Sequence, residues 1–169
     1  LDSPENFMWQ VGLACKLLEQ LPIKQMYVDD CEADDLIGWF CRHRFKDDKR
    51  QIVICSADQD MHQLLRPGVI QYNAKKTITH NDVVEKYGIT PENFVTARAF
   101  IGDKYDRING IKGVGFKTLA RKFPQLAAKS FVSVDDILTE CKLRNSQKSM
   151  KLYESIIAQP DVPKLNWRL

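Results

Sequence analysis

The feature that most restricts the fold of this chain is the β-branched run Gln51–Cys55, which ends in the acidic loop Ser56–Asp60. A nearly continuous apolar run of this length predicts a strand of a parallel sheet that is buried on both faces. Open α/β sheets place their functional groups beyond the carboxyl ends of such strands. Residues two apart on an extended chain point the same way, so Asp58 and Asp60 can direct both carboxylates at one point. An ordinary polar loop is the alternative interpretation.

Helices and short strands alternate around this run, which predicts an α/β protein with a mainly helical C-terminal part. Helical periodicity and turn residues predict helices over 4–21, from the acidic segment Glu32–Asp35 to about 43, and after the acidic loop through 65. Further helices are predicted over 81–87, 91–101, 116–123, 134–143 and 147–158. A short extended stretch is expected over 25–28, and a small hairpin over 69–72 and 77–79.

Composition excludes several classes of protein. The 169 residues are 44% hydrophobic and 28% charged, which is ordinary for a soluble globular protein, and the formal charge of +3 does not by itself indicate a nucleic-acid partner. The five cysteines are widely spaced and form no CxxC or Cys/His pattern, so we interpret them as reduced thiols of an intracellular protein, located in the cytoplasm or nucleoid or in a host cell. No apolar run approaches the roughly 20 residues of a membrane span, and no membrane partner is expected.

Carboxylates gather in three clusters along the chain. These are Glu32, Asp34 and Asp35, then Asp58 and Asp60, then Asp103 and Asp106. For the first cluster, capping of the apolar helix that follows and a metal site are equally good interpretations. Seven converging carboxylates would repel one another without cations, and oxygen ligands without Cys or His favour Mg²⁺ or Mn²⁺. Two such ions about 4 Å apart suit phosphodiester hydrolysis.

A glycine-containing basic segment, Ile108–Lys122, follows the third cluster. Its glycines allow backbone N–H groups to approach a phosphate, and the helix that follows directs the positive end of its dipole at the same anion. The candidate DNA-binding residues are Lys112, Gly113, Gly115, Lys117, Thr118 and Arg121. Such contacts read no bases, so binding is expected to be independent of sequence and sensitive to salt. A packed turn between two helices is the alternative.

Taken in order, the motifs EADD, SADQD, GDKYD and GIKGVGFKT resemble those of the 5′-nuclease family, from about Pro4 to Phe123. This family includes flap endonucleases, phage 5′-exonucleases and the 5′-nuclease domain of bacterial DNA polymerase I. The resemblance implies a partial PIN-like α/β core with a parallel sheet, the C-terminal portion of the family's catalytic core, over residues 1–101, and a helical DNA-binding region over residues 102–169.

The resemblance also implies roles for individual residues in two-metal hydrolysis of DNA. Glu32, Asp34 and Asp35 match the acids of the first metal, and Asp58, Asp60, Asp103 and Asp106 match those of the second. Gly110–Thr118 matches the helix–hairpin–helix portion of a helix-two-turn-helix element, which in the family often holds a K⁺ ion. The implied substrates are branched, nicked or 5′-ended duplex DNA.

The chain departs from the family pattern in two places. Tyr105, Arg107 and Asn109 replace residues that are common in the family, and we expect the turn to survive these changes. The family's first acidic strand and basic helical arch find no match in residues 1–30, where Asp2 follows no strand. We therefore expect a chain that starts inside the family fold, with a second polypeptide as a possible partner. His62 is interpreted as a residue on a helix surface or partly buried, without a catalytic role.

Two alternative functions follow from these observations. A non-catalytic, structure-specific DNA-binding subunit would need a second polypeptide for activity. An unrelated helix–hairpin–helix repair protein, such as a glycosylase, would explain GIKGVG but neither EADD nor SADQD.

Overall fold

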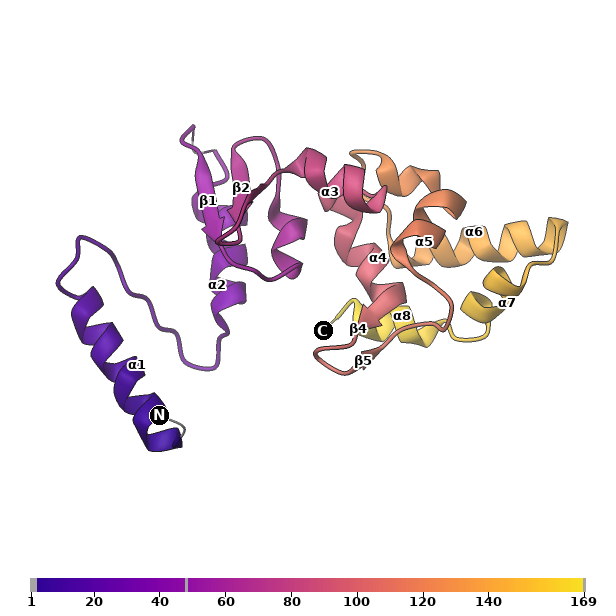
Figure 1. Ribbon diagram of the computed structural model, residues 1–169. Coiled ribbons are helices and arrows are strands. Elements are labelled where there is room, and N and C mark those ends of the chain that lie inside the picture. Colours follow the sequence, from indigo (N-terminus) through magenta and orange to yellow (C-terminus); the bar gives the residue numbers. More distant parts are fainter. Residues whose placement is uncertain (1–2, 48, 169) are drawn as a thin grey trace. The chain divides into compact units, whose positions relative to one another are not determined.

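The computed structural model describes residues 3–47 and 49–168 and divides the chain into two compact units, residues 1–36 and 37–169. Figure 1 shows the helices and strands of both units. Asp2 lies outside the described residues.

The first unit consists of helix α1 (Pro4–Leu18), a connecting segment and the start of helix α2 (Ala33–Trp39). Ser3 caps α1 by accepting a hydrogen bond from the Asn6 N–H at 3.2 Å, and Pro4 occupies the first helical position, where its missing N–H is not needed. The helix therefore begins where the sequence predicts, but it ends three residues early. No described residue of α1 is buried, and the extended stretch over 25–28 forms no strand.

A three-stranded sheet opens the second unit. Strand β1 (Ile52–Cys55) pairs in parallel with β2 (Val69–Tyr72), and β2 pairs antiparallel with β3 (Thr77–Ile78). The parallel pairing and the hairpin are as predicted. Burial of β1 on both faces is not, because Ile54 is 4% exposed whereas Val53 is 48% exposed. Successive side chains of a strand point to opposite faces of the sheet, and in the described part of the chain only the Ile54 face of β1 is covered. Strand β1 is also the edge strand of the described sheet.

The segments that follow the strands are helical. Helix α2 continues into a π-helical turn (Phe40–Arg44), and a 3₁₀ helix (Asp60–Leu64) follows the acidic loop. Helix α3 (His80–Tyr87) begins with a capping box between Thr79 and Asp82 and ends at Gly88, whose φ of 70° suits the left-handed C-cap. A 3₁₀ turn (Pro91–Asn93) then leads into helix α4 (Phe94–Ile101).

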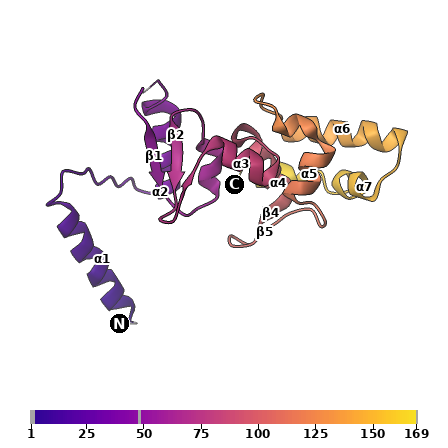
Figure 2. The same ribbon diagram turned by 45° about the horizontal axis from the view of Figure 1, so that its top comes forward.

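The rest of the second unit is helical apart from a short hairpin, β4 (Gly102–Asp103) and β5 (Ile108–Asn109). The remaining elements are α5 (Phe116–Lys122), a 3₁₀ turn (Pro124–Ala127), α6 (Val134–Gln147), α7 (Lys151–Ile157) and α8 (Asp161–Asn166). Helices α6 and α7 pack side by side, as both ribbon views show (Figures 1 and 2). Helix α8, which the sequence analysis missed, packs on α4.

The core of this unit lies around α4. Phe94, Phe100, Leu119 and Phe123 are at most 1% exposed. The fully buried Asn93 side chain fastens the segment before α6, since it donates to the carbonyls of Ala128 and Ser130 and accepts from the Val132 N–H. Among the described residues, no helix combines the length and apolar character that a bilayer crossing requires.

Candidate metal centre

Three carboxylates from separate segments meet in the second unit. Asp60 begins the 3₁₀ helix after the acidic loop, Asp103 lies in β4, and Asp106 lies in the turn between β4 and β5. Each offers an oxygen atom, and these three atoms lie within 4.8 Å of one another. Asp60 and Asp103 are half-buried and Asp106 is exposed. A cluster of this kind can ligate a hard cation through oxygen atoms.

Two glycines fix the position of Asp103. A Cβ atom on Gly102, whose φ is 75°, would lie 2.4 Å from the Ile108 carbonyl oxygen, and one on Gly110 would lie 1.9 Å from the Ile101 carbonyl oxygen. Only glycine allows the backbone to approach so closely at these points. The Asp103 carboxylate also accepts a hydrogen bond from the Tyr105 N–H at 2.7 Å. The end of α4 therefore places Asp103 and Asp106 in one compact turn.

Arg98 lies against this cluster. Its Nη2 atom is 3.3 Å from Asp60 Oδ1 and also pairs with Asp103 Oδ2, while Nη1 donates to the Gly102 carbonyl at 3.2 Å. The guanidinium therefore offsets part of the repulsion between the two carboxylates. The role of Arg98 beside the carboxylates was not predicted from the sequence. A signal for it was present, since Arg98 is the single cation of the apolar helix FVTARAFI and lies five residues before Asp103.

Asp58 lies outside the cluster formed by Asp60, Asp103 and Asp106. Its carboxylate accepts a hydrogen bond from the Asp60 N–H at 2.8 Å, and its own N–H donates to Ser56 Oγ at 3.0 Å. The buried side chain of Gln71, which is 1% exposed, holds the loop in place by donating hydrogen bonds to the carbonyls of Ser56 and Asp58. Asp58 therefore orders the loop that carries Asp60 and is not one of the three grouped carboxylates.

The first acidic cluster lies in the first unit, at the start of α2. Asp35 Oδ2 accepts a hydrogen bond from the Glu32 N–H at 3.3 Å, and Asp34 Oδ1 accepts one from the Asp35 N–H at 3.0 Å. These are the contacts expected for acids that cap a helix N-terminus. The metal-binding role of Glu32, Asp34 and Asp35 stays a prediction.

His62 is more deeply buried than predicted, at 3% exposure, because it packs between aromatic rings of two helices. Its ring meets Phe94 edge-on at a centroid distance of 5.2 Å and Tyr87 at 5.7 Å. Burial, together with the charge of Lys86, lowers the pKa of His62 to about 4, so the imidazole is neutral at pH 7. Its Nδ1 atom is buried without a hydrogen-bond partner in the described part of the chain.

The basic segment forms a turn followed by α5. Val114 donates to the Ile111 carbonyl, Gly113 has a φ of 84°, and Gly115 is the N-cap residue whose carbonyl accepts from Thr118 and Leu119. The side chains of Lys112, Lys117 and Arg121 are exposed. The structure thus leaves these cations accessible, and their DNA-binding role stays a prediction.

The fold and the acidic site place the chain in a known class. Residues 2–88 match the family model described as the 5′-3′ exonuclease, N-terminal resolvase-like domain, and the chain belongs to this 5′-nuclease family. A DNA polymerase I from Rhizobium leguminosarum is 30% identical over 96% of this chain and 15% of its own length. A 5′-3′ exonuclease from Buchnera aphidicola is 34% identical over 73% of this chain and 44% of its own. The chain thus spans less than half the length of these relatives.

Solved structures support the same fold. The D15 protein of phage T5, co-crystallized with metal ions, has a TM-score of 0.78 at 20% identity and covers 96% of this chain and 58% of its own. The T5 D15 flap endonuclease in a complex with DNA and metal ions has a TM-score of 0.77 at 21% identity and covers 96% of this chain and 57% of its own. The predicted α/β fold with substantial helical content is therefore confirmed.

Proposed function

We propose that this chain is a divalent-metal-dependent 5′ nuclease that hydrolyses DNA phosphodiesters. The observation that carries the proposal is the grouping of Asp60, Asp103 and Asp106, with oxygen atoms within 4.8 Å, in a chain of the 5′-nuclease family. The T5 relatives with bound metal ions and DNA support it.

The donor set fits a hard cation. Asp60, Asp103 and Asp106 offer only oxygen atoms, as Mg²⁺ and Mn²⁺ prefer. When bound, such an ion lowers the pKa of a bound water molecule and stabilises negative charge on a phosphate. Arg98 holds Asp60 and Asp103 in position and limits their repulsion, and Asp58 orients the loop that carries Asp60.

The two-metal form of the mechanism assigns the first ion to Glu32, Asp34 and Asp35, and the second ion to Asp58, Asp60, Asp103 and Asp106. The support for this role of the first three acids is the family match over residues 2–88, which includes all three. No side chain is required as a nucleophile, because metal-bound water can serve in that role.

The DNA partner is proposed to be a branched, nicked or 5′-ended duplex. The exposed cations Lys112, Lys117 and Arg121 at the turn and α5 suit phosphate groups and carry no base-reading geometry. A helix–hairpin–helix role for Gly110–Thr118, with K⁺ bound there, belongs to the same proposal.

The test is cleavage of 5′-labelled flap and nicked duplexes in the presence of Mg²⁺, Mn²⁺ or EDTA. We expect metal-dependent release of 5′ fragments, reduced at least about 100-fold by Asp103→Asn. Asp135→Asn is a matched control on α6, where the carboxylate is largely exposed and pairs with Lys164. Cleavage that survives both EDTA and Asp103→Asn would overturn the proposal. Salt-sensitive duplex binding without any cleavage would instead favour a binding module.

A further inference from the structure

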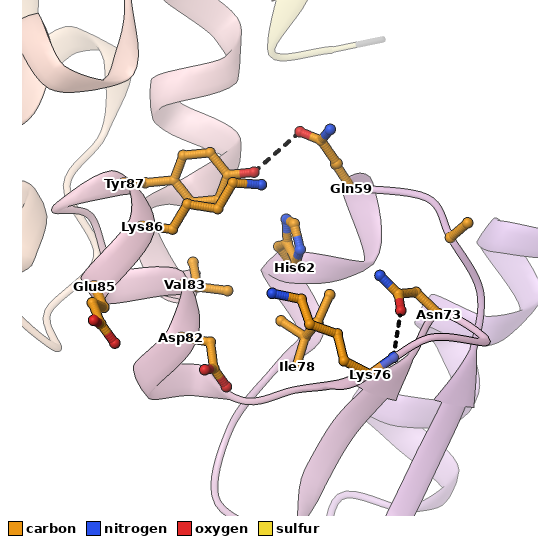
Figure 3. Close-up of a pocket in the computed structure, with 11 residues that line it drawn as sticks. Gln59, His62, Asn73, Lys76, Ile78, Asp82, Val83, Glu85, Lys86 and Tyr87 are labelled. Atoms are coloured by element: carbon orange, nitrogen blue, oxygen red, sulfur yellow. Dashed lines mark hydrogen bonds between the residues drawn. The ribbon is translucent and has the colours of Figure 1, made fainter.

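A cavity of about 500 Å³ lies beside the acidic loop, between that loop, the turn that joins β2 to β3, and helix α3. Its volume is within the range of about 300–1,000 Å³ that is typical of small-molecule sites. Figure 3 shows the side chains that line it. The polar residues that line it include Gln59, His62, Asn73, Lys76 and Lys86.

The acceptor atoms of the amide side chains in this cavity are already occupied. Asn73 Oδ1 accepts from the N–H groups of Lys75 and Lys76 at 3.2 and 3.0 Å, and Gln59 Oε1 accepts from the Tyr87 hydroxyl at 3.1 Å. The amide N–H₂ groups therefore remain as donors, and in Figure 3 the nitrogen of Asn73 points toward the space before the His62 ring. The two amide side chains of the lining therefore offer donors, which suit an oxygen-rich anion.

Two ammonium groups face the same space. Lys76 extends from the β2–β3 turn and Lys86 from α3, and neither forms an ion pair with a carboxylate among the described residues. Lys86 Nζ rests over the Tyr87 ring, 4.6 Å from its centroid, which holds it near the cavity. The lining also contains two carboxylates. Asp82 accepts from the Thr79 N–H at 2.7 Å and lies near enough to Lys76 for that ammonium to help lower its pKa, while Figure 3 shows Glu85 pointing away from His62.

The wall of the cavity contains an unsatisfied buried atom. His62 is 3% exposed, and its Nδ1 has no partner in the described part of the chain. This atom has almost no accessible surface, so a ligand in the cavity does not reach it, and His62 contributes only the shape of the wall. The case for an anion therefore rests on the lysines and the amide donors.

We propose that this cavity binds a nucleotide unit through its 5′-phosphate. Lys76, Lys86 and the Asn73 amide contact the phosphate, and the apolar side chains of Ile78 and Val83 contact the sugar and base. Ammonium and amide donors together form charge-assisted hydrogen bonds with phosphate oxygens, and the volume leaves room for more than a phosphate. The ligand is a free nucleoside monophosphate or the phosphorylated 5′ end of a strand, which share this chemistry. The proposal does not require cleavage activity.

The test is calorimetric titration of the full chain with deoxyadenosine 5′-monophosphate in EDTA. We expect saturable one-to-one binding, weakened about tenfold or more by Lys76→Gln and by Lys86→Gln, because each removes one charged donor. Lys75→Gln is the matched control, since Lys75 is an exposed neighbour outside the cavity lining. Deoxyadenosine should bind at least about tenfold more weakly than its monophosphate. Absence of binding at millimolar nucleotide, or equal losses in all three lysine variants, would overturn the proposal.

Competition separates the two sources of the ligand. Displacement by a 5′-phosphorylated trinucleotide identifies a strand end, and failure of that competitor identifies a free nucleotide; both outcomes support the phosphate site. Equal displacement by a trinucleotide with a 5′-hydroxyl would contradict it, because the cavity would then not select a terminal phosphate. The Asp60→Asn/Asp103→Asn variant should bind the nucleotide normally, so failure of the nuclease proposal and failure of this one are distinguishable.

Discussion

Asp60 and Asp103 are held by contacts between distant segments of the second unit, whereas Glu32, Asp34 and Asp35 form their described hydrogen bonds with residues at most four positions away. Arg98 joins Asp60 to Asp103, and buried Gln71 fixes the loop before Asp60. A site positioned by packed neighbours loses little freedom when a cation binds, while a locally held cluster must still be ordered. The difference indicates that the second unit carries the better preorganised metal centre.

The largest predicted difference is in thiol reactivity between two cysteines, the buried Cys141 of the second unit and the exposed Cys15 of the first. Burial, and then the Glu140 carboxylate, raises the pKa of Cys141 in the second unit from 9.0 to about 12. Its thiolate at pH 8 is therefore about a thousandfold scarcer than that of an ordinary thiol. Cys15 in the first unit is exposed. Alkylation at pH 8 followed by mass spectrometry should label Cys15 about a thousandfold faster than Cys141.

The control for this measurement is a single substitution at Cys15. Cys15→Ser should remove labelling of the Cys15 peptide and leave the labelling rate of Cys141 unchanged, while the exposed Cys55 still accounts for fast labelling. Labelling of Cys141 as fast as that of Cys15 would show that the second unit opens readily, and the contrast in preorganisation would be lost.

A second prediction concerns the glycine that lets β4 and β5 close. Gly110→Ala places a Cβ atom 1.9 Å from the Ile101 carbonyl oxygen, so the backbone that carries Asp103 must shift. We expect the free energy of unfolding to fall by about 3 kcal/mol or more and Mn²⁺ affinity to fall with it. Urea denaturation and calorimetry measure the two. Gly12→Ala is the control in α1, where a Cβ atom meets nothing within 4 Å, and it should not destabilise the chain.

A third prediction tests Arg98 as the cation that compensates the cluster. Arg98→Gln leaves Asp60 and Asp103 without their partner, and we expect a loss of about 1–2 kcal/mol in the free energy of unfolding in EDTA. Mn²⁺ should restore much of this loss, because a divalent cation replaces the missing charge. Thermal unfolding with EDTA and with Mn²⁺ checks both statements, and the exposed Lys142→Gln serves as control. If Mn²⁺ raised the thermal stability of the variant and of the unsubstituted chain equally, Arg98 would not be the cation that compensates the cluster.

Local patterns in the sequence predict most of the elements around the site. The β-branched run predicts β1, the alternating segments predict the β2–β3 hairpin, and the apolar spacing before Gly102 predicts α4. Exposure of Val53 could not be predicted in this way, because it depends on what packs on that face of the sheet and not on the residues of β1 itself.

The contacts between distant segments could not be predicted from the sequence either. Arg98 meets Asp60 because α4 packs on the 3₁₀ helix Asp60–Leu64, and it meets Asp103 because Gly102 and Gly110 bring the hairpin back toward α4. His62 is buried by Tyr87 and Phe94, which lie 25 or more positions further along the chain. Spacing within a motif identifies which residue types are present, while pairing and burial depend on how distant segments pack.

The smallest predicted effect decides between the two roles of the first acidic cluster. Asp35→Asn keeps an oxygen that can accept from the Glu32 N–H but removes the charge, so capping should survive and the free energy of unfolding should change by less than about 0.5 kcal/mol. A metal ligand would behave differently, since an amide oxygen is a weaker partner than a carboxylate for Mn²⁺. Calorimetric titration should then show one fewer Mn²⁺ ion bound while the site of Asp60, Asp103 and Asp106 is retained. An unchanged Mn²⁺ stoichiometry would assign Asp35 to capping and leave the second unit as the proposed metal centre. Asp29→Asn, which replaces an exposed acid outside the cluster, controls for the loss of one negative charge.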